Sequence, residues 1–103
     1  MLDYRVRTFL TVCDTMNYTQ AAHRLNITQP AVSQHIRCLE AAYRVRLFLY
    51  EGKQLTLTRA GEILRRRLTA LENDERALRA ELSSLPAGIE ELSLGVTMTI
   101  GEY

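Results

Sequence analysis

Four polar side chains with the spacing of one helix face suggest the clearest chemistry in this chain of 103 residues. Gln29, Ser33 and Arg37 step by four, and Gln34 precedes Arg37 by three, which brings these side chains to the same side of a helix. Amide and guanidinium groups can hydrogen-bond base edges, and hydroxyl and guanidinium groups can also bind phosphate oxygens. This set therefore predicts a helix that reads nucleic acid.

The segment that carries these residues has the signals of a helix over 29–43. Thr28 is a good N-cap, and Pro30 falls in the first turn, where its missing N–H costs little. An apolar stripe steps by four, three and four along one side and consists of Val32, Ile36, Leu39 and Tyr43. The opposite side consists of Pro30, Ser33, Gln34, Arg37 and Ala41. We expect the stripe to face a core and the polar side to face a partner.

Two shorter helices are expected before it. Residues 2–15 place Leu2, Val6, Phe9, Leu10 and Cys13 at helical spacing. Thr19 is then expected to cap a second helix with the sequence TQAAHRL, and Asn26 and Ile27 form a turn. Two helices joined by about three residues predict a helix-turn-helix.

A β-hairpin is expected after that unit. Val45, Leu47 and Leu49 alternate with Arg46, Phe48 and Tyr50, and a second alternating run covers residues 55–58. Glu51, Gly52 and Lys53 lie between the two runs, as in a tight turn. Such a hairpin would form a wing, with Lys53 at its tip placed to reach a phosphate or the minor groove.

A long helix is expected from Arg59 to about Leu85, with Thr58 as its N-cap. Its seam positions step by four and three, as in a heptad repeat, and Glu75 is the one polar residue among them. They are Leu64, Leu68, Leu71, Glu75, Leu78, Leu82 and Leu85. Most of this seam extends beyond the reach of a three-helix unit, so it favours a homodimer, and Glu75 could set the register. The alternative is that the stripe packs back onto the chain's own core.

Composition narrows the function classes. Residues 1–58 hold seven Arg or Lys against four acidic residues, a net charge of +3, whereas residues 59–103 have a net charge of −2. An anionic partner is therefore expected at the front half. We expect a cytoplasmic protein, since no signal peptide or membrane-spanning run is visible.

Metal, cofactor and enzyme chemistry are not indicated by the sequence. Cys13 and Cys38 are expected to be small buried hydrophobes, because no Cys/His spacing of a zinc site is present. No nucleophile with a base and no phosphate-binding glycine loop is evident, so we expect no cofactor and no enzyme.

The order of these motifs resembles the N-terminal part of a LysR-type transcriptional regulator. The resemblance rests on TQAAHRL, TQPAVSQHIRCLE, VRLF and LTLTRAG in that order and spacing, and it covers nearly the whole chain. It implies a mainly α fold, with a winged helix-turn-helix of three helices and a hairpin followed by a long dimerisation helix.

The resemblance also implies a division of the chain and its partners. Residues 1–58 would form the DNA-binding domain, 59–85 the linker helix that pairs two subunits, and 86–103 a linker and the first strand of an effector-binding domain. That strand is LSLGVTMTIGEY. The partners implied are double-stranded promoter DNA, a second copy of the chain and, in a complete effector domain, a small-molecule inducer.

The DNA contacts implied by the resemblance extend beyond the first four residues. They fall on Thr19, Gln29, Pro30, Ala31, Ser33, Gln34, Arg37 and Lys53, and we add Thr28 as the cap of the recognition helix. Three positions depart from the family pattern. Arg44 stands where glycine is common, Tyr50 where arginine is frequent, and Gln34 where Arg or Lys is frequent.

Each candidate residue also has a simpler interpretation. Gln29 and Ser33 could be solvated, Arg37 could pair with Glu40, and Lys53 could serve solubility alone. His23 and His35 are expected to have surface or packing roles, and the run 65–67 is expected to be a solvated face or to help hold flanking DNA. A helical dimerisation module whose winged domain binds protein is the competing function. Its docking helix would be expected to show aromatic or Arg anchors packed among apolar neighbours, whereas the outer face of 29–37 shows Gln, Pro, Ser, Gln and a single Arg.

Overall fold

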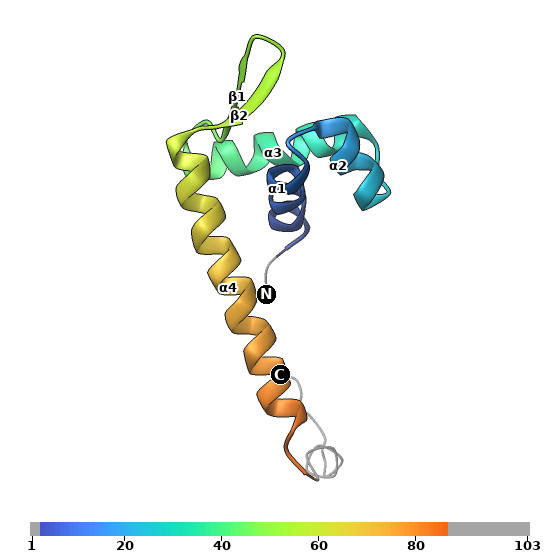
Figure 1. Ribbon diagram of the computed structural model, residues 1–103, viewed down its shortest axis with the longest axis vertical. Coiled ribbons are helices and arrows are strands. Elements are labelled where there is room, and N and C mark those ends of the chain that lie inside the picture. The colour runs from blue at the N-terminus through green and yellow to red at the C-terminus, as the bar shows by residue number, and fades with distance from the viewer. Residues whose placement is uncertain (1–2, 87–103) are drawn as a thin grey trace. The chain divides into compact units, whose positions relative to one another are not determined.

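The computed structural model describes residues 3–86. Three helices come first: α1 (Tyr4–Thr15), α2 (Tyr18–Leu25) and α3 (Gln29–Tyr43). A hairpin of β1 (Phe48–Glu51) and β2 (Gln54–Leu57) follows, and then the long helix α4 (Arg59–Ser83) (Figure 1). This confirms the expected fold class of a winged helix-turn-helix followed by a long helix. One compact unit extends to Glu72, and a second begins at Asn73.

Side-chain caps begin the first two helices. The Asp3 carboxylate accepts hydrogen bonds from the backbone N–H groups of Arg5 and Val6 at the start of α1. The Asn17 side chain accepts one from Gln20 N at 2.9 Å at the start of α2. The expectation that Thr19 caps this helix was therefore wrong, because Asn17 satisfies the first turn and Thr19 lies inside it.

The turn between α2 and α3 is built as predicted. Asn26 takes the left-handed conformation at φ 61°, and Thr28 Oγ1 accepts a hydrogen bond from Ala31 N at 3.2 Å. The apolar side of α3 buries Val32, Ile36 and Leu39. Tyr43 was expected on this buried side but is 54% exposed, because the helix ends there and α3 packs against the core only over its earlier turns.

The hairpin pairs Phe48 with Leu57 and Glu51 with Gln54, so Gly52 and Lys53 form a two-residue turn. Gly52 has φ +65°, a conformation that glycine adopts without steric cost. The strand begins later than the alternation suggested. Val45 N donates to Glu40 O at 3.2 Å and Leu47 N to the Glu40 carboxylate at 2.8 Å, so these N–H groups are used before the ladder starts. Phe48 is buried, whereas Leu49 is exposed.

The core joins the helices, the hairpin and the start of α4. Its most completely buried side chains are Phe9, Phe48, Ile36, Leu47, Val12, Val32 and Thr8. The rings of Phe9 and Phe48 lie 5.5 Å apart, which links α1 to the hairpin. Thr8 is polar and buried, and its hydroxyl lies 2.8 Å from His35 Nδ1, a contact between α1 and α3. His35 thus has the packing role that was expected.

The start of α4 is fixed to this core. Thr58 Oγ1 accepts a hydrogen bond from Gly61 N at 3.0 Å, as predicted for the N-cap, and donates one to Arg46 O. Gly61 and Leu68 are buried, and Leu64 packs partly against the core. Part of the predicted seam therefore does pack back onto the chain's own domain.

The later seam residues are open to solvent. Leu71, Leu78 and Leu82 are 51–57% exposed, and Leu85 lies beyond the end of α4 and is 57% exposed. Glu75 accepts a hydrogen bond from Arg79 at 3.0 Å. The predicted strand LSLGVTMTIGEY lies outside the described residues. Within residues 3–86 no helix is long and apolar enough to span a membrane, and no cluster of three metal-ligating side chains occurs.

Candidate nucleic-acid interface

Hydrogen bonds along the outer face of α3 hold its polar side chains in a row. Gln29 Nε2 donates to Ser33 Oγ at 2.9 Å, and Arg37 donates to Gln34 Oε1 at 3.1 Å. Gln29, Gln34 and Arg37 are exposed, and Ser33 is half-buried. The four residues that suggested base and phosphate recognition therefore lie together, and they are exposed to a partner along about two turns of helix.

The remaining α3 candidates surround the start of that helix. Thr28 and Pro30 are exposed, and Ala31 is half-buried. The Thr28 hydroxyl accepts the hydrogen bond from Ala31 N as a cap, which leaves its proton available to a partner. Pro30 and Ala31 offer only apolar contact and close approach of the backbone.

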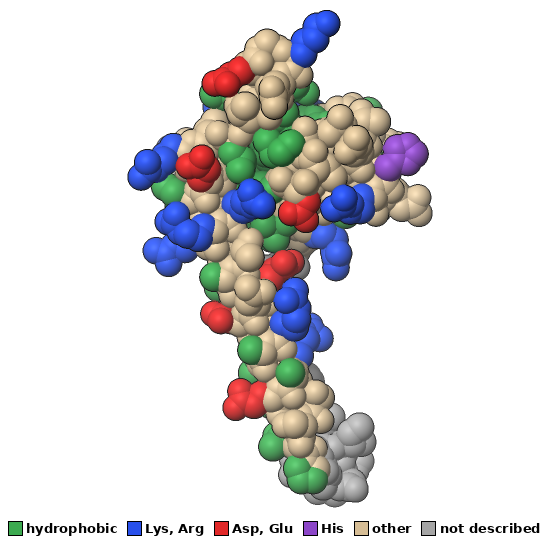
Figure 2. Space-filling model, in the orientation of Figure 1, with side chains coloured by type: hydrophobic (Ala, Val, Ile, Leu, Met, Phe, Trp, Pro, Cys, Tyr) green, Lys and Arg blue, Asp and Glu red, His purple; other side chains and the backbone are tan. Residues whose placement is uncertain are grey.

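A shallow groove connects α2, α3 and the hairpin. Its lining includes Thr19, Gln29, Tyr50 and Lys53. The tip of the hairpin carries a positively charged side chain, visible at the outer end of the loop in Figure 2. Residues separated by more than 30 positions in the sequence thus line one groove. Lys53 shares this groove with Gln29, which belongs to the recognition face, the polar face of α3 formed by Gln29, Ser33, Gln34 and Arg37.

A second groove lies between α3 and the hairpin. Ser33, Arg37, Arg46 and Tyr50 contribute to its lining, together with Glu40. Arg46 was not among the sequence candidates, yet its side chain is 69% exposed. The alternation over 45–50 indicated only that Arg46 belongs to a strand. Its place in the folded chain, at the edge of this groove, is what makes it a candidate contact residue.

Tyr18 borders both grooves from the first turn of α2. Burial raises the pKa of its hydroxyl to about 12, with the nearby charge of Glu40 as the next contribution. Its ring meets Phe48 edge-on, with centroids 6.1 Å apart. Tyr18 therefore stays a neutral hydrogen-bonding group that fixes the hairpin against the helix-turn-helix.

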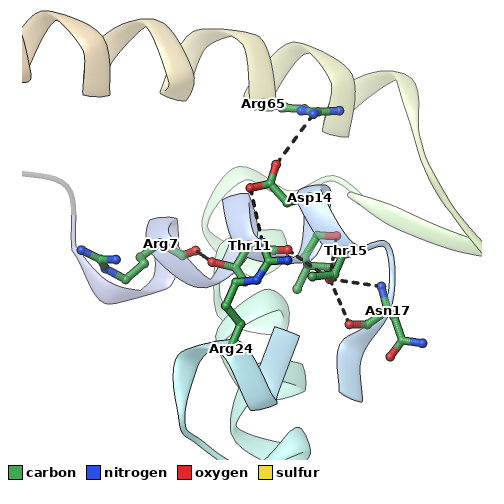
Figure 3. A network of polar contacts seen from close by, with 8 residues as sticks. Arg7, Thr11, Asp14, Thr15, Asn17, Arg24 and Arg65 are labelled. Atoms are coloured by element: carbon green, nitrogen blue, oxygen red, sulfur yellow. Dashed lines mark hydrogen bonds and ion pairs between the residues drawn. The ribbon is translucent and has the colours of Figure 1, made fainter. Parts of the chain in front are cut away.

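Two long ion pairs connect three helices (Figure 3). The Asp14 carboxylate of α1 lies 3.9 Å from Arg24 of α2 and 4.0 Å from Arg65 of α4. All three side chains are about half exposed, so these pairs contribute little to stability on their own. Of the basic run 65–67, Arg65 thus has a structural contact.

The family is decided by the match of sequence and fold together. The sequence model described as "Bacterial regulatory helix-turn-helix protein, lysR family" matches residues 4–62, which cover all the elements from α1 to the hairpin. The chain belongs to the LysR family. Its fold is therefore that of a LysR-type helix-turn-helix DNA-binding domain, in a family of transcriptional regulators.

Individual relatives agree with this assignment to the LysR family. A crystal structure of a LysR-family transcriptional regulator from Eggerthella lenta is 67% identical and covers 67% of this chain and 99% of that one, with a TM-score of 0.64. DarR of Vibrio fischeri, solved in complex with DNA, is 30% identical and covers 82% of this chain and 29% of its own, with a TM-score of 0.71.

A full-length relative shows how much of a regulator the chain spans. The transcriptional regulator CysL of Bacillus subtilis is 34% identical over 99 residues, which are 95% of this chain and 33% of CysL. The LysR-family chain thus spans about a third of that relative.

Proposed function

We propose that this chain binds double-stranded promoter DNA as a homodimer in the cytoplasm, with α3 in the major groove and the hairpin near the minor groove. The observation that carries the proposal is the row of exposed polar side chains on α3, linked by the Gln29–Ser33 and Gln34–Arg37 hydrogen bonds. The major groove admits a helix, and such side chains can hydrogen-bond base edges.

Each side chain has a proposed role. Gln29 and Ser33 read base edges, and a paired amide contact to adenine discriminates between bases by about 1–3 kcal/mol. Gln34 and Arg37 contact a base or phosphate farther along the groove. Thr19 and Thr28 hydrogen-bond phosphates near the starts of two helices, Pro30 and Ala31 allow close approach, and Lys53 reaches the backbone from the wing.

Dimerisation is proposed through the exposed seam of α4. Leu71, Leu78 and Leu82 remain solvent-exposed in the single chain, and water favours covering such side chains. The proposed contact residues are Leu71, Glu75, Leu78, Leu82 and Leu85, with the half-buried Leu64 at the edge of the seam. Leu68, which the periodicity included, is left out because it is buried in the chain's own core. Glu75 and Arg79 would then place a polar pair within an otherwise apolar seam.

The proposed organisation assigns 1–58 to DNA binding, 59–85 to dimerisation and 86–103 to the start of an effector-binding domain. The small-molecule inducer would bind only to a complete effector domain. Two copies would present two α3 helices to half-sites whose spacing is set by the dimer.

The competing protein-binding function has less support. The exposed positions 29, 34 and 37 of α3 carry two amides and a single guanidinium group, whereas a protein-docking helix would show aromatic or Arg anchors packed among apolar neighbours.

A salt titration tests the DNA-binding function. The chain is titrated onto a fluorescein-labelled 40-bp duplex at several salt concentrations, and binding is followed by fluorescence anisotropy. We expect the affinity to fall linearly with salt on a log–log plot, since phosphate contacts release counterions. No binding, or an affinity independent of salt, would contradict DNA binding.

A further inference from the structure

Arg46 is a basic side chain without a role in the contacts assigned above. It lies in the connection between α3 and β1, and its side chain is 69% exposed. It lines the same groove as Ser33 and Arg37, two residues of the recognition face, and Tyr50 of the hairpin borders this groove as well. The groove is therefore lined by two guanidinium groups, that of Arg37 from α3 and that of Arg46 from the connection before β1.

Glu40 fixes where the Arg46 side chain lies. The Glu40 carboxylate is only 16% exposed and accepts a hydrogen bond from Leu47 N at 2.8 Å, so it is anchored to the backbone. Its oxygen lies 3.5 Å from Arg46 Nε, and an Arg46 terminal nitrogen donates to Phe48 O at 3.4 Å. The carboxylate thus holds one edge of the guanidinium while most of the side chain remains in solvent.

The chemistry of this group suits a phosphate. A guanidinium keeps its charge at any working pH and presents a planar set of N–H donors that fits phosphate oxygens. Its contacts with Glu40 and Phe48 O are long, at 3.5 and 3.4 Å, and most of the Arg46 side chain is exposed, so its free N–H groups can bind an incoming phosphate while Glu40 keeps the other edge.

We propose that Arg46 is a DNA-backbone contact at the junction of α3 and the hairpin, held in place by Glu40. It would bind a phosphate on the wing side of the major groove that α3 enters. This inference rests on the proposed DNA-binding function, and it adds a residue to the contact set without assigning it any base specificity.

Four variants of the full chain test the proposal with the labelled 40-bp duplex. Arg46→Gln removes the charge but keeps an amide that can hydrogen-bond Glu40. Arg46→Lys keeps the charge, and Arg7→Gln removes one charge from the exposed side of α1, away from both grooves. Circular dichroism and thermal melting verify that each variant is folded, and Arg46→Ala provides a second neutral variant.

The slope of log affinity against log salt is the deciding readout. We expect Arg46→Gln to lower its magnitude by about 0.9 for each subunit, the value for one phosphate contact, and so by about 1.8 for the dimer, and to weaken binding on the order of fivefold per contact. Arg46→Lys and Arg7→Gln should keep the wild-type slope. An unchanged slope in Arg46→Gln would overturn the proposal, as would an equal loss in Arg7→Gln, which would indicate net charge alone.

The result for the wild-type chain distinguishes a failure of the DNA-binding function from a failure of the Arg46 contact alone. If it fails to bind with a salt-dependent affinity, the DNA-binding function itself is wrong. If it binds as expected and only the Arg46→Gln comparison fails, then DNA binding stands and Arg46 is not a contact.

Discussion

Arg44 ends α3 in a backbone conformation that suits glycine. Its φ of 58° and ψ of 44° are left-handed, and its N–H donates to Glu40 O as a helix cap. A side chain with a Cβ pays a steric cost there of about 1 kcal/mol relative to glycine. The sequence comparison with the family marked this position, and the geometry confirms that its conformation is left-handed.

Arg44→Gly should therefore relieve about 1 kcal/mol of strain in the folded domain. The greater conformational entropy of glycine in the unfolded chain offsets part of this gain, so we expect a smaller net stabilisation. Urea denaturation followed by circular dichroism measures the free energy of unfolding. Ala41→Gly, in the ordinary helical part of α3, is the matched control and should destabilise by about 1 kcal/mol. A loss of stability in Arg44→Gly would contradict this explanation.

The two cysteines should differ in reactivity. Burial raises the pKa of the Cys13 thiol to about 12, whereas Cys38 is only half-buried. At pH 8 the thiolate fraction of Cys13 is on the order of 10⁻⁴, and the thiolate is the reactive form. Iodoacetamide should thus label Cys38 first, as followed by peptide mass spectrometry. Labelling in denaturant serves as the control, and equal native rates would count against a buried Cys13.

Residue types and spacing alone predicted part of the proposed interface, as a set of polar side chains on one helix face. Gln29, Ser33, Gln34 and Arg37 were predicted because helical spacing places them on one face, and the structure keeps them there. Arg46 could not be found this way, because its exposure depends on how Glu40 holds the segment before β1. The cap of α2 was misassigned to Thr19, since Asn17 and Thr19 are both good capping residues and only the backbone path selects between them.

At the scale of elements, Gly61 allows the first turns of α4 to pack closely against the backbone at Leu47 and the side chain of Leu57. A Cβ built on Gly61 would overlap Leu47 O and the Leu57 side chain, so α4 packs directly against the backbone that precedes β1. The sequence LTLTRAG marked the Thr58 cap and the helix start, but this contact depends on the fold.

Gly61→Ala should destabilise the domain by about 1–3 kcal/mol, although alanine is the better helix former. The clash involves a backbone carbonyl, which cannot move aside as a side chain can. Thermal melting monitors the change, and Thr69→Ala, an exposed position on the same helix, should be neutral or slightly stabilising. Equal or higher stability in Gly61→Ala would refute the close packing.

At the scale of the whole molecule, the exposed leucines of α4 are the basis of the proposed homodimer. Periodicity predicted a seam of seven positions, and the structure divides it: Leu68 is buried in the chain's own core, whereas Leu78 and Leu82 remain exposed. Heptad spacing could not distinguish packing against the chain's own core from packing against a second helix, because both require apolar residues on one side of the helix.

Leu78→Glu with Leu82→Glu should therefore convert a dimer into a monomer, because two carboxylates cannot be buried in an apolar seam without large cost. Analytical ultracentrifugation measures the mass of each species. Ala80→Glu with Ser84→Glu, at the same spacing on another side of the chain, should remain dimeric. A wild-type monomer at micromolar concentration, or a dimer in the first variant, would argue against the seam.

The most direct test of sequence-specific DNA binding is selection from a random duplex library by the wild-type chain and by Gln29→Ala with Ser33→Ala. We expect the wild type to enrich one motif, and the folded variant to bind DNA with a similar salt slope but enrich none. Enrichment of the same motif by both proteins would show that this face of α3 does not read the bases.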